Sequence, residues 1–92
     1  MKLILEGSVQ ELGRYAKLDH VFELNSQAVG HQQSFGLSAM AVEIKEFESG
    51  QVTFILHRDL NKDIVILKLG ESKRFSSGGN AYAYELTFAL VE

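Results

Sequence analysis

Large and small side chains alternate along the last eleven residues of the chain. Large residues occupy every second position from Tyr82 to Leu90, and the positions between them carry mostly alanine, threonine and valine. This period of two predicts a β-strand, because successive side chains of a strand point to opposite faces of the sheet. Since few of these residues are charged on either face, the pattern predicts an interior strand over 82–92 that other elements cover on both sides.

The same alternation predicts a hairpin in the middle of the chain. Apolar residues alternate over Met40–Phe47 and again over Val52–Leu56, with Glu48-Ser49-Gly50 between them as the turn. Gly50 suits the left-handed position of a short hairpin loop, and the register of Phe47 indicates a bulge just before it.

Three further segments follow the hairpin before the last strand. Residues 59–63 are rich in Asp and Asn, which predicts a turn. Ile64–Leu69 is apolar at most positions, which predicts a central strand. The Gly- and Ser-rich segment 70–80 is expected to be a long connection.

The first quarter of the chain predicts a strand followed by a helix. Lys2–Glu6 is expected to be the strand. Ser8 and Glu11 have the spacing of a helix capping box. Val9, Leu12 and Ala16 then form one apolar stripe of a helix that ends near 17–19, with Gly13 in its interior. The pattern leaves open whether Val21–Leu24 is strand or helix, and it predicts a loop or a bent strand start over Asn25–Phe35.

Together these elements predict an α+β fold. We expect a mostly antiparallel sheet of about five strands, in the order β-α-β-β-β-β, with one N-terminal helix packed on it. The helix is expected to cover the alanine side of the sheet, near Ala39, Ala41 and the last strand. The large-residue side would then be covered by the sheet curling on itself or by another subunit.

Composition narrows the class of protein. The 92 residues are expected to form a single domain, 1–92, and 46% hydrophobic with 23% charged residues is typical of a folded chain. There is no cysteine, so no disulfide or thiolate chemistry is available, and a cytoplasmic location is expected. No segment approaches the length of a membrane span, so no membrane partner is expected.

The motifs indicate a protein that is not an enzyme. His57-Arg58-Asp59-Leu60 resembles the start of the protein-kinase catalytic loop, but position 64, which would have to be asparagine, is isoleucine. Asp59-x-Asn61-x-Asp63 resembles the opening of a calcium loop, but the closing acidic position is Gly70. We therefore expect no catalytic residues, no metal and no cofactor.

Protein–protein contact is the function that the sequence favours. The formal net charge of −3 argues against general nucleic-acid binding. We expect an inhibitor, an immunity or adaptor protein, or an assembly subunit, of a kind that phage or mobile elements encode. Its partner is an unidentified protein, or further copies of the chain in a homodimer or higher homo-oligomer. The expected partner-binding residues are the carboxylates around the hairpin and the following turn: Glu43, Glu46, Glu48, Asp59 and Asp63.

Two alternatives remain open at this point. One is a nucleic-acid- or phosphate-binding subunit that uses the Lys73/Arg74 Gly-Ser-rich loop. Its residues would be Lys68, Lys73, Arg74, Asn80 and Tyr82. The backbone N–H groups of the loop would cradle an anion, and the tyrosine would stack on bases. The other is a small-ligand binder with a pocket between helix and sheet.

Overall fold

The protein is a sandwich of eight β-strands. The computed structural model describes residues 1–37, 40–58, 61–79 and 82–92, and these contain no helix. The predicted α+β fold is therefore wrong, and the structure is all-β. The strands are β1 (Lys2–Glu11), β2 (Arg14–Glu23), β3 (Gln32–Phe35), β4 (Met40–Glu48), β5 (Gln51–Arg58), β6 (Asn61–Lys68), β7 (Ser72–Ser77) and β8 (Tyr82–Val91).

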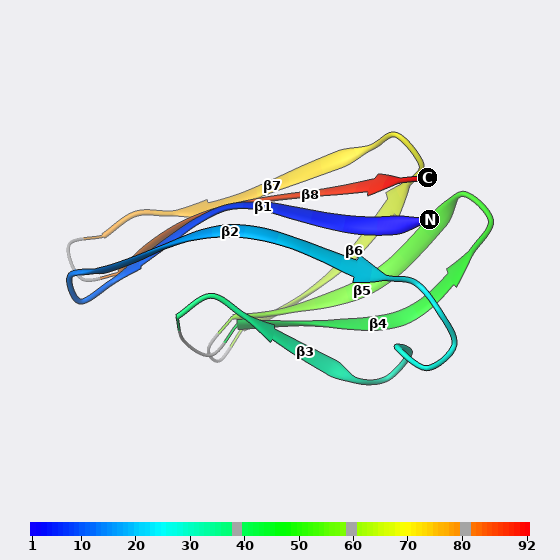
Figure 1. Ribbon diagram of the computed structural model, residues 1–92, viewed down its shortest axis with the longest axis horizontal. Helices are drawn as coiled ribbons and strands as arrows, with labels where there is room; N and C mark the ends of the chain where they lie inside the picture. Colours follow the sequence, from blue (N-terminus) through cyan, green and yellow to red (C-terminus); the bar gives the residue numbers. More distant parts are fainter. Residues whose placement is uncertain (38–39, 59–60, 80–81) are drawn as a thin grey trace.

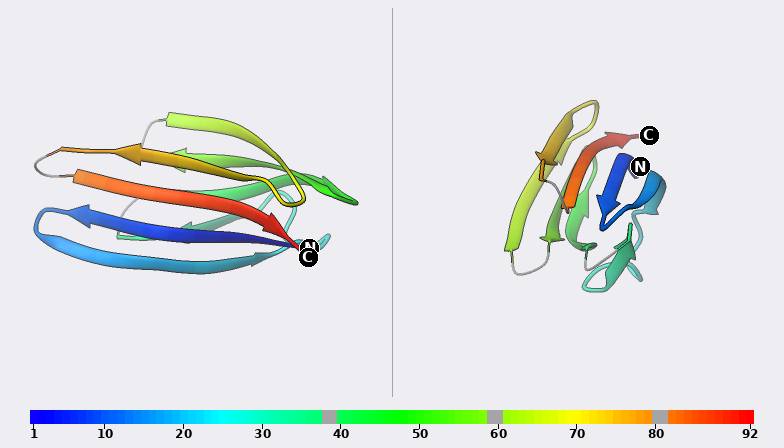
Figure 2. Two further views of the ribbon diagram at one scale, coloured as in Figure 1. Left: turned by 90° about the horizontal axis from the view of Figure 1, so that it is seen from above. Right: turned by 90° about the vertical axis from the view of Figure 1, so that its left-hand side faces the viewer.

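Two antiparallel sheets of four strands form the two layers of the sandwich (Figures 1 and 2). Sheet A has the order β2-β1-β8-β7, and sheet B is the meander β3-β4-β5-β6. The chain enters sheet B after β2 and returns to sheet A after β6. The first and last strands are neighbours in sheet A, where Lys2 lies opposite Val91, so the two termini lie together at one end of the molecule.

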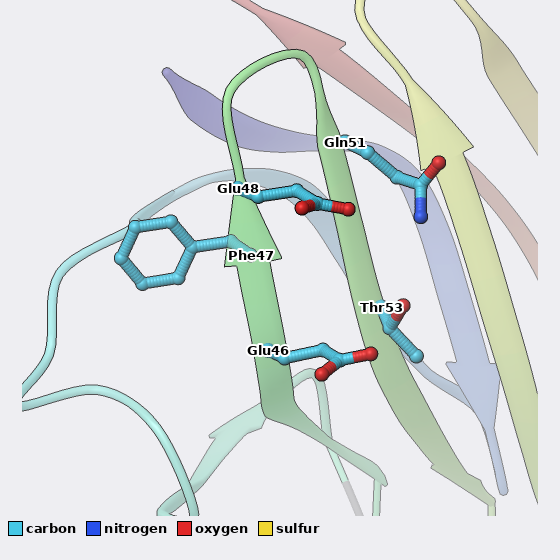
Figure 3. Close-up of a pocket in the computed structure, with 5 residues that line it drawn as sticks. All are labelled: Glu46, Phe47, Glu48, Gln51 and Thr53. Carbon is cyan, nitrogen blue, oxygen red and sulfur yellow. The ribbon is translucent and has the colours of Figure 1, made fainter.

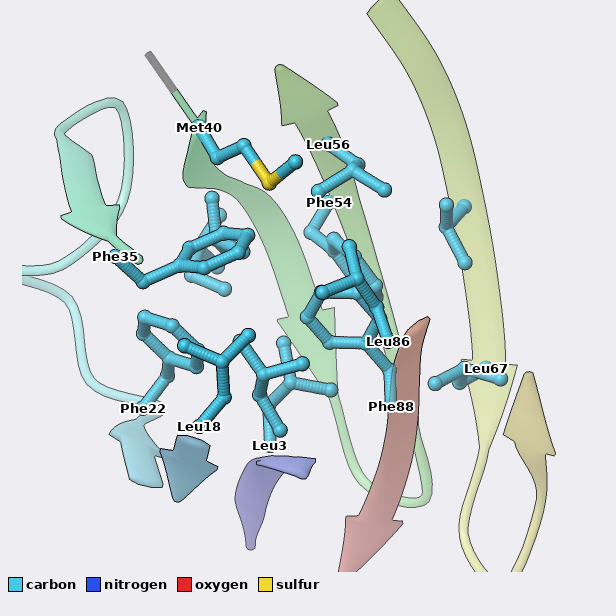
Figure 4. Packing of buried hydrophobic residues seen from close by; sticks show 14 of the residues in the cluster. Leu3, Leu18, Phe22, Phe35, Met40, Phe54, Leu56, Leu67, Leu86 and Phe88 are labelled. Atoms are coloured by element: carbon cyan, nitrogen blue, oxygen red, sulfur yellow. The ribbon is translucent and has the colours of Figure 1, made fainter. Parts of the chain in front are cut away.

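The core lies between the sheets and is made of the inward positions of both (Figure 4). Leu86 and Phe88 of β8 are fully buried, which confirms the predicted strand and its large-residue face. The Phe88 ring meets the Phe54 ring of β5 with centroids 5.0 Å apart. Each such side chain contributes about 1.5–3 kcal/mol when it is buried. The second sheet of the same chain therefore supplies the cover that the large-residue face requires.

The predicted N-terminal helix is instead a β-hairpin. β1 continues through Ser8 to Glu11, and β2 begins at Arg14, so Leu12 and Gly13 form a two-residue turn. Their φ angles are 48° and 80°, and two positive φ values are characteristic of the type I′ turn that suits the twist of a hairpin. Leu12 is 77% exposed, so the helical spacing of Val9, Leu12 and Ala16 was coincidental.

Strand β2 also settles the open question at Val21–Leu24, because the strand extends to Glu23. The following polar segment begins with a turn in which the Ala28 amide donates to both the backbone and side-chain oxygens of Asn25. The chain then enters sheet B as the short strand β3, close to the expectation of a loop with a bent strand start.

The central hairpin was predicted correctly. β4 and β5 are joined by Ser49-Gly50, and Gly50 has a φ of 83°. The register shifts between Ile44 and Glu46, which places the predicted bulge at Lys45. The bulge lets Ile44 face the core while Glu46 faces solvent.

Three further predictions about the second half were wrong. The strand expected to be central, now β6, is an edge strand of sheet B. The expected connection over 70–80 contains strand β7. No helix within the described residues covers the alanine side of β8, where Ala83 and Ala89 are only partly buried. Of the two hairpin alanines, Ala41 is buried on the outer face of sheet B, and Ala39 lies outside the described residues.

Candidate functional site

The outer face of sheet B carries two of the five predicted carboxylates in exposed positions. Glu46 and Glu48 lie on β4 opposite Thr53 and Gln51 of β5. In Figure 3 these four side chains point to one side of the hairpin and Phe47 points to the other, as the period of a strand requires. The five residues line a hollow of about 90 Å³. That volume holds a few water molecules, so the hollow is a surface feature and too small for a drug-sized ligand.

Glu43 lies on the same face but is engaged within the chain. Its Oε1 is 3.0 Å from Nε2 of His57 on β5, and its Oε2 is 3.4 Å from Nζ of Lys45. The hydrogen bond with His57 lowers the pKa of Glu43, and Lys45 lowers it further, while partial burial opposes both. Among the described residues, no hydrogen bond joins His57 to a serine, threonine or tyrosine hydroxyl.

The fourth carboxylate, Asp63, faces away from this surface. It forms an ion pair with Arg58, whose guanidinium also donates to the Tyr84 hydroxyl. The same guanidinium lies 5.6 Å from the centre of the Phe75 ring and 5.8 Å from that of Tyr84. This cluster joins β5 and β6 to sheet A at one end of the sandwich, so it has a structural role. The fifth carboxylate, Asp59, lies outside the described residues.

The basic residues of the nucleic-acid alternative lie on different surfaces. Lys68 is on the outer face of sheet B, since it lies opposite Gln51. Arg74 is on the outer face of sheet A, where it forms an ion pair with Glu85. Lys73 of β7 lies opposite Phe88, on the other face of the strand from Arg74, with Nζ 5.7 Å from the centre of the Phe75 ring.

Of the two remaining residues of that alternative, Tyr82 is the one that the structure describes. The Tyr82 ring packs against the Tyr84 ring, with centroids 5.9 Å apart. It is half-buried at the margin of the core. Asn80 lies outside the described residues. The small-ligand pocket between helix and sheet has no counterpart, because the described residues contain no helix.

The surface that sequence reasoning missed is an isoleucine patch on the outer face of sheet B. Ile64 and Ile66 of β6 are 73% and 57% exposed, although Val65 and Leu67 between them are buried. Ile64 lies opposite Ile55 of β5, which is partly exposed on the same face. We call Ile55, Ile64 and Ile66 the isoleucine patch.

Charged residues flank the isoleucine patch on both sides. Lys62 and Lys68 lie near the two ends of β6. They are on the same face as Ile64 and Ile66, because all four residues are separated by even numbers of positions along the strand. Glu46 and Glu48 lie on β4, across β5 from this strand. The sequence did contain a signal for this surface: lysine at both ends of an apolar run is typical of an edge strand and not of a central one.

Two kinds of functional feature, a metal-binding cluster and a membrane-spanning helix, are absent from the described parts of the chain. No group of three or more His, Asp or Glu side chains there is placed to hold a metal ion. No helix in those same ranges has the length and apolar character needed to cross a membrane.

Comparisons with models of known protein families, with curated proteins and with solved structures found no match.

Proposed function

We propose that this protein is a non-enzymatic binding domain that contacts a protein partner through the outer face of sheet B. The observation that carries this proposal is the exposure of Ile64 and Ile66, side by side on one strand, at 73% and 57%. Together with Ile55 they form a contiguous apolar surface on a face that carries charged residues at both margins. An apolar centre with a polar rim is the usual anatomy of a protein interface.

The energetics favour covering this patch. Burying one isoleucine side chain fully stabilises a complex by about 1.5–3 kcal/mol, so the two exposed residues of β6 offer a substantial part of a binding energy. The flanking charges would contribute chiefly to the rate and specificity of association. Glu46 and Glu48 favour a partner with basic groups at that margin, in keeping with the small acidic proteins that occlude basic surfaces.

The other candidate chemistries have less support. His57 and Glu43 form a pair without a hydroxyl partner among the described residues, and the cations Lys68, Lys73 and Arg74 do not share a surface. We therefore do not carry the nucleic-acid alternative forward. An inhibitor, an immunity or adaptor protein, and an assembly subunit all remain within the proposal. So does a phage or mobile-element origin. We also propose a cytoplasmic location, which the absence of cysteine favours.

Quantitative affinity capture from the source organism tests the proposal. The bait is compared with a variant carrying Ile64→Thr and Ile66→Thr, which keeps β-propensity but removes apolar area. Val21→Thr is the matched control, since Val21 is 52% exposed on the other sheet. We expect a partner that the wild type and the control retain and that the double variant loses by about tenfold or more.

Thermal unfolding must show that all three proteins are folded. Equal recovery of every captured protein by the wild type and the double variant would contradict the proposal.

A further inference from the structure

Strand β6 is a long edge strand of sheet B. Among the described strands it pairs only with β5, over eight residues in a continuous register without a bulge. The other described edges are less suited to accept another strand: β3 has four residues, and β7 has six, with Lys73 and Arg74 adjacent. β2 is longer, but Lys17 and Asp19 separate its exposed apolar side chains.

The backbone N–H and C=O groups of β6 alternate between β5 and the free edge, and those of the exposed isoleucines point toward the free edge. The Leu69 amide, which continues the β6 register, donates to the Gly50 carbonyl at 2.8 Å. In an antiparallel ladder alternate residues bond to the same neighbour, so Leu67 and Val65 also direct their backbone groups toward β5. The N–H and C=O groups of Ile64 and Ile66 therefore point toward the free edge.

A second copy of β6 is a poor match for this edge. An antiparallel copy that places Ile64 opposite Ile66 of its partner also places Lys62 opposite Lys68, at both ends of the pair. Like charges directly opposite each other destabilise strand pairing. In this register the lysines therefore disfavour a second copy and favour a strand with acidic residues at those positions.

From these observations we propose that the β6 edge binds an extended segment of the partner as an added antiparallel strand. The segment has the pattern acidic–x–apolar–x–apolar–x–acidic, so that its apolar residues face Ile64 and Ile66 and its acidic residues face Lys62 and Lys68. Main-chain hydrogen bonds provide affinity, and the alternating side chains provide specificity. This inference rests on the proposed function and specifies the mode of binding.

Synthetic peptides of defined pattern test the mode directly. The probe is the acetylated and amidated peptide Ser-Glu-Thr-Val-Thr-Val-Thr-Glu-Ser. The comparison peptide has Lys in place of both Glu residues. A third peptide has the Glu sequence with both valine nitrogens methylated. Binding is followed by isothermal titration calorimetry and by amide shifts in two-dimensional NMR of the folded protein.

We expect saturable binding of the Glu-flanked peptide, with the largest amide shifts at Ile64 and Ile66. The Lys-flanked peptide should bind about tenfold more weakly, because two attractive cross-strand pairs become repulsive. The methylated peptide should not bind, since its backbone cannot complete the ladder.

Charge reversal in the protein provides the decisive comparison. A variant with Lys62→Glu and Lys68→Glu should prefer the Lys-flanked peptide by about tenfold. The matched control, with Lys2→Glu and Lys17→Glu, has the same net charge but changes the outer face of sheet A, so it should keep the wild-type preference. Binding of the methylated peptide, shifts centred on β2, or an unchanged preference in the Lys62/Lys68 variant would overturn strand addition.

The failure of this inference is distinguishable from failure of the proposed function. If the Glu-flanked peptide does not bind but the isoleucine variant loses a captured partner, strand addition is wrong and the binding face stands. If neither effect is seen, both are wrong. Light scattering that gives a dimer in place of the 10.3 kDa monomer would also overturn the choice of an acidic segment over a second copy.

Discussion

Gly7 occupies a position in β1 where no side chain fits. It lies in the middle of the strand opposite Leu86 of β8, with a φ of 151°. A Cβ atom built there would lie 1.9 Å from the backbone carbonyl oxygen of Glu85 and 2.9 Å from its carbonyl carbon. Because the obstacle is backbone in the neighbouring strand, it cannot rotate away as a flexible side chain would. Gly7→Ala therefore forces β1 and β8 apart.

The expected loss of unfolding free energy in Gly7→Ala follows from the interactions that separating β1 and β8 disturbs. Holding alanine at a positive φ costs about 1–2 kcal/mol. Moving β1 weakens ladder hydrogen bonds worth about 0.5–1.5 kcal/mol each. It also displaces Leu5 and Val9, which are almost completely buried on either side of Gly7, and misfitting core side chains costs about 1–3 kcal/mol. We expect a loss of about 4 kcal/mol, from a total unfolding free energy of roughly 5–14 kcal/mol for a chain of this length.

Urea denaturation and differential scanning calorimetry measure this loss, with Gly13→Ala as the matched control. Gly13 also has a positive φ, 80°, but nothing lies within 4 Å of its Cβ position. The control should lose about 1–2 kcal/mol from backbone strain alone. The Tm of Gly7→Ala should fall by about 15–30 °C. If the two variants lose the same free energy within about 0.5 kcal/mol, the close approach at Glu85 is refuted.

Four other substitutions have defined outcomes in the same unfolding assays. Leu12→Asn should raise the unfolding free energy by about 1 kcal/mol, because asparagine tolerates the positive φ of this turn better than leucine; an unchanged or lower value contradicts the turn assignment. Glu43→Gln should lower stability near neutral pH, because the hydrogen bond with His57 lowers the pKa of Glu43 in the folded state. That difference should be present above the unfolded pKa of about 4.5 and shrink as the pH falls through the lower folded pKa. A difference that grows as the pH falls contradicts it. Arg58→Ala should lower the unfolding free energy by about 2 kcal/mol, since it leaves a half-buried carboxylate and a tyrosine hydroxyl without their donor. The control Arg74→Ala removes an exposed ion pair and should lower it by less than about 1 kcal/mol. Equal losses would contradict the structural role of Arg58.

Local signals predicted the parts of the fold in which pattern and turn chemistry agree. The β4–β5 hairpin has clear alternation, a glycine at the turn and a bulge that the register of Phe47 reveals. The β1–β2 hairpin also has a two-residue turn, but both of its turn residues have positive φ, and leucine rarely occupies the left-handed position where Leu12 lies. A serine and a glutamate three residues apart then resembled a helix cap.

The binding surface was only partly predictable for a related reason. Glu46 and Glu48, two of the predicted partner-binding carboxylates, lie on one face of the hairpin in the structure. Whether a strand with apolar residues on both faces is central or at an edge depends on its neighbours, which the period does not specify. The strand of Ile64 and Ile66 was therefore predicted to be central, although among the described strands it has a neighbour on one side only.

The amino-acid sequence by itself determined which residues of each strand share a face, since that depends on the chain's own backbone geometry. It also determined the central hairpin and the large-residue face of β8. That face must be buried, because exposing large apolar side chains to water is unfavourable. Only the tertiary structure decided that a second sheet covers this face, that β6 is an edge, and that Arg58 meets Asp63 and Tyr84. These outcomes depend on pairing between segments far apart in the chain, whose free energy is a sum over many contacts that no local pattern records.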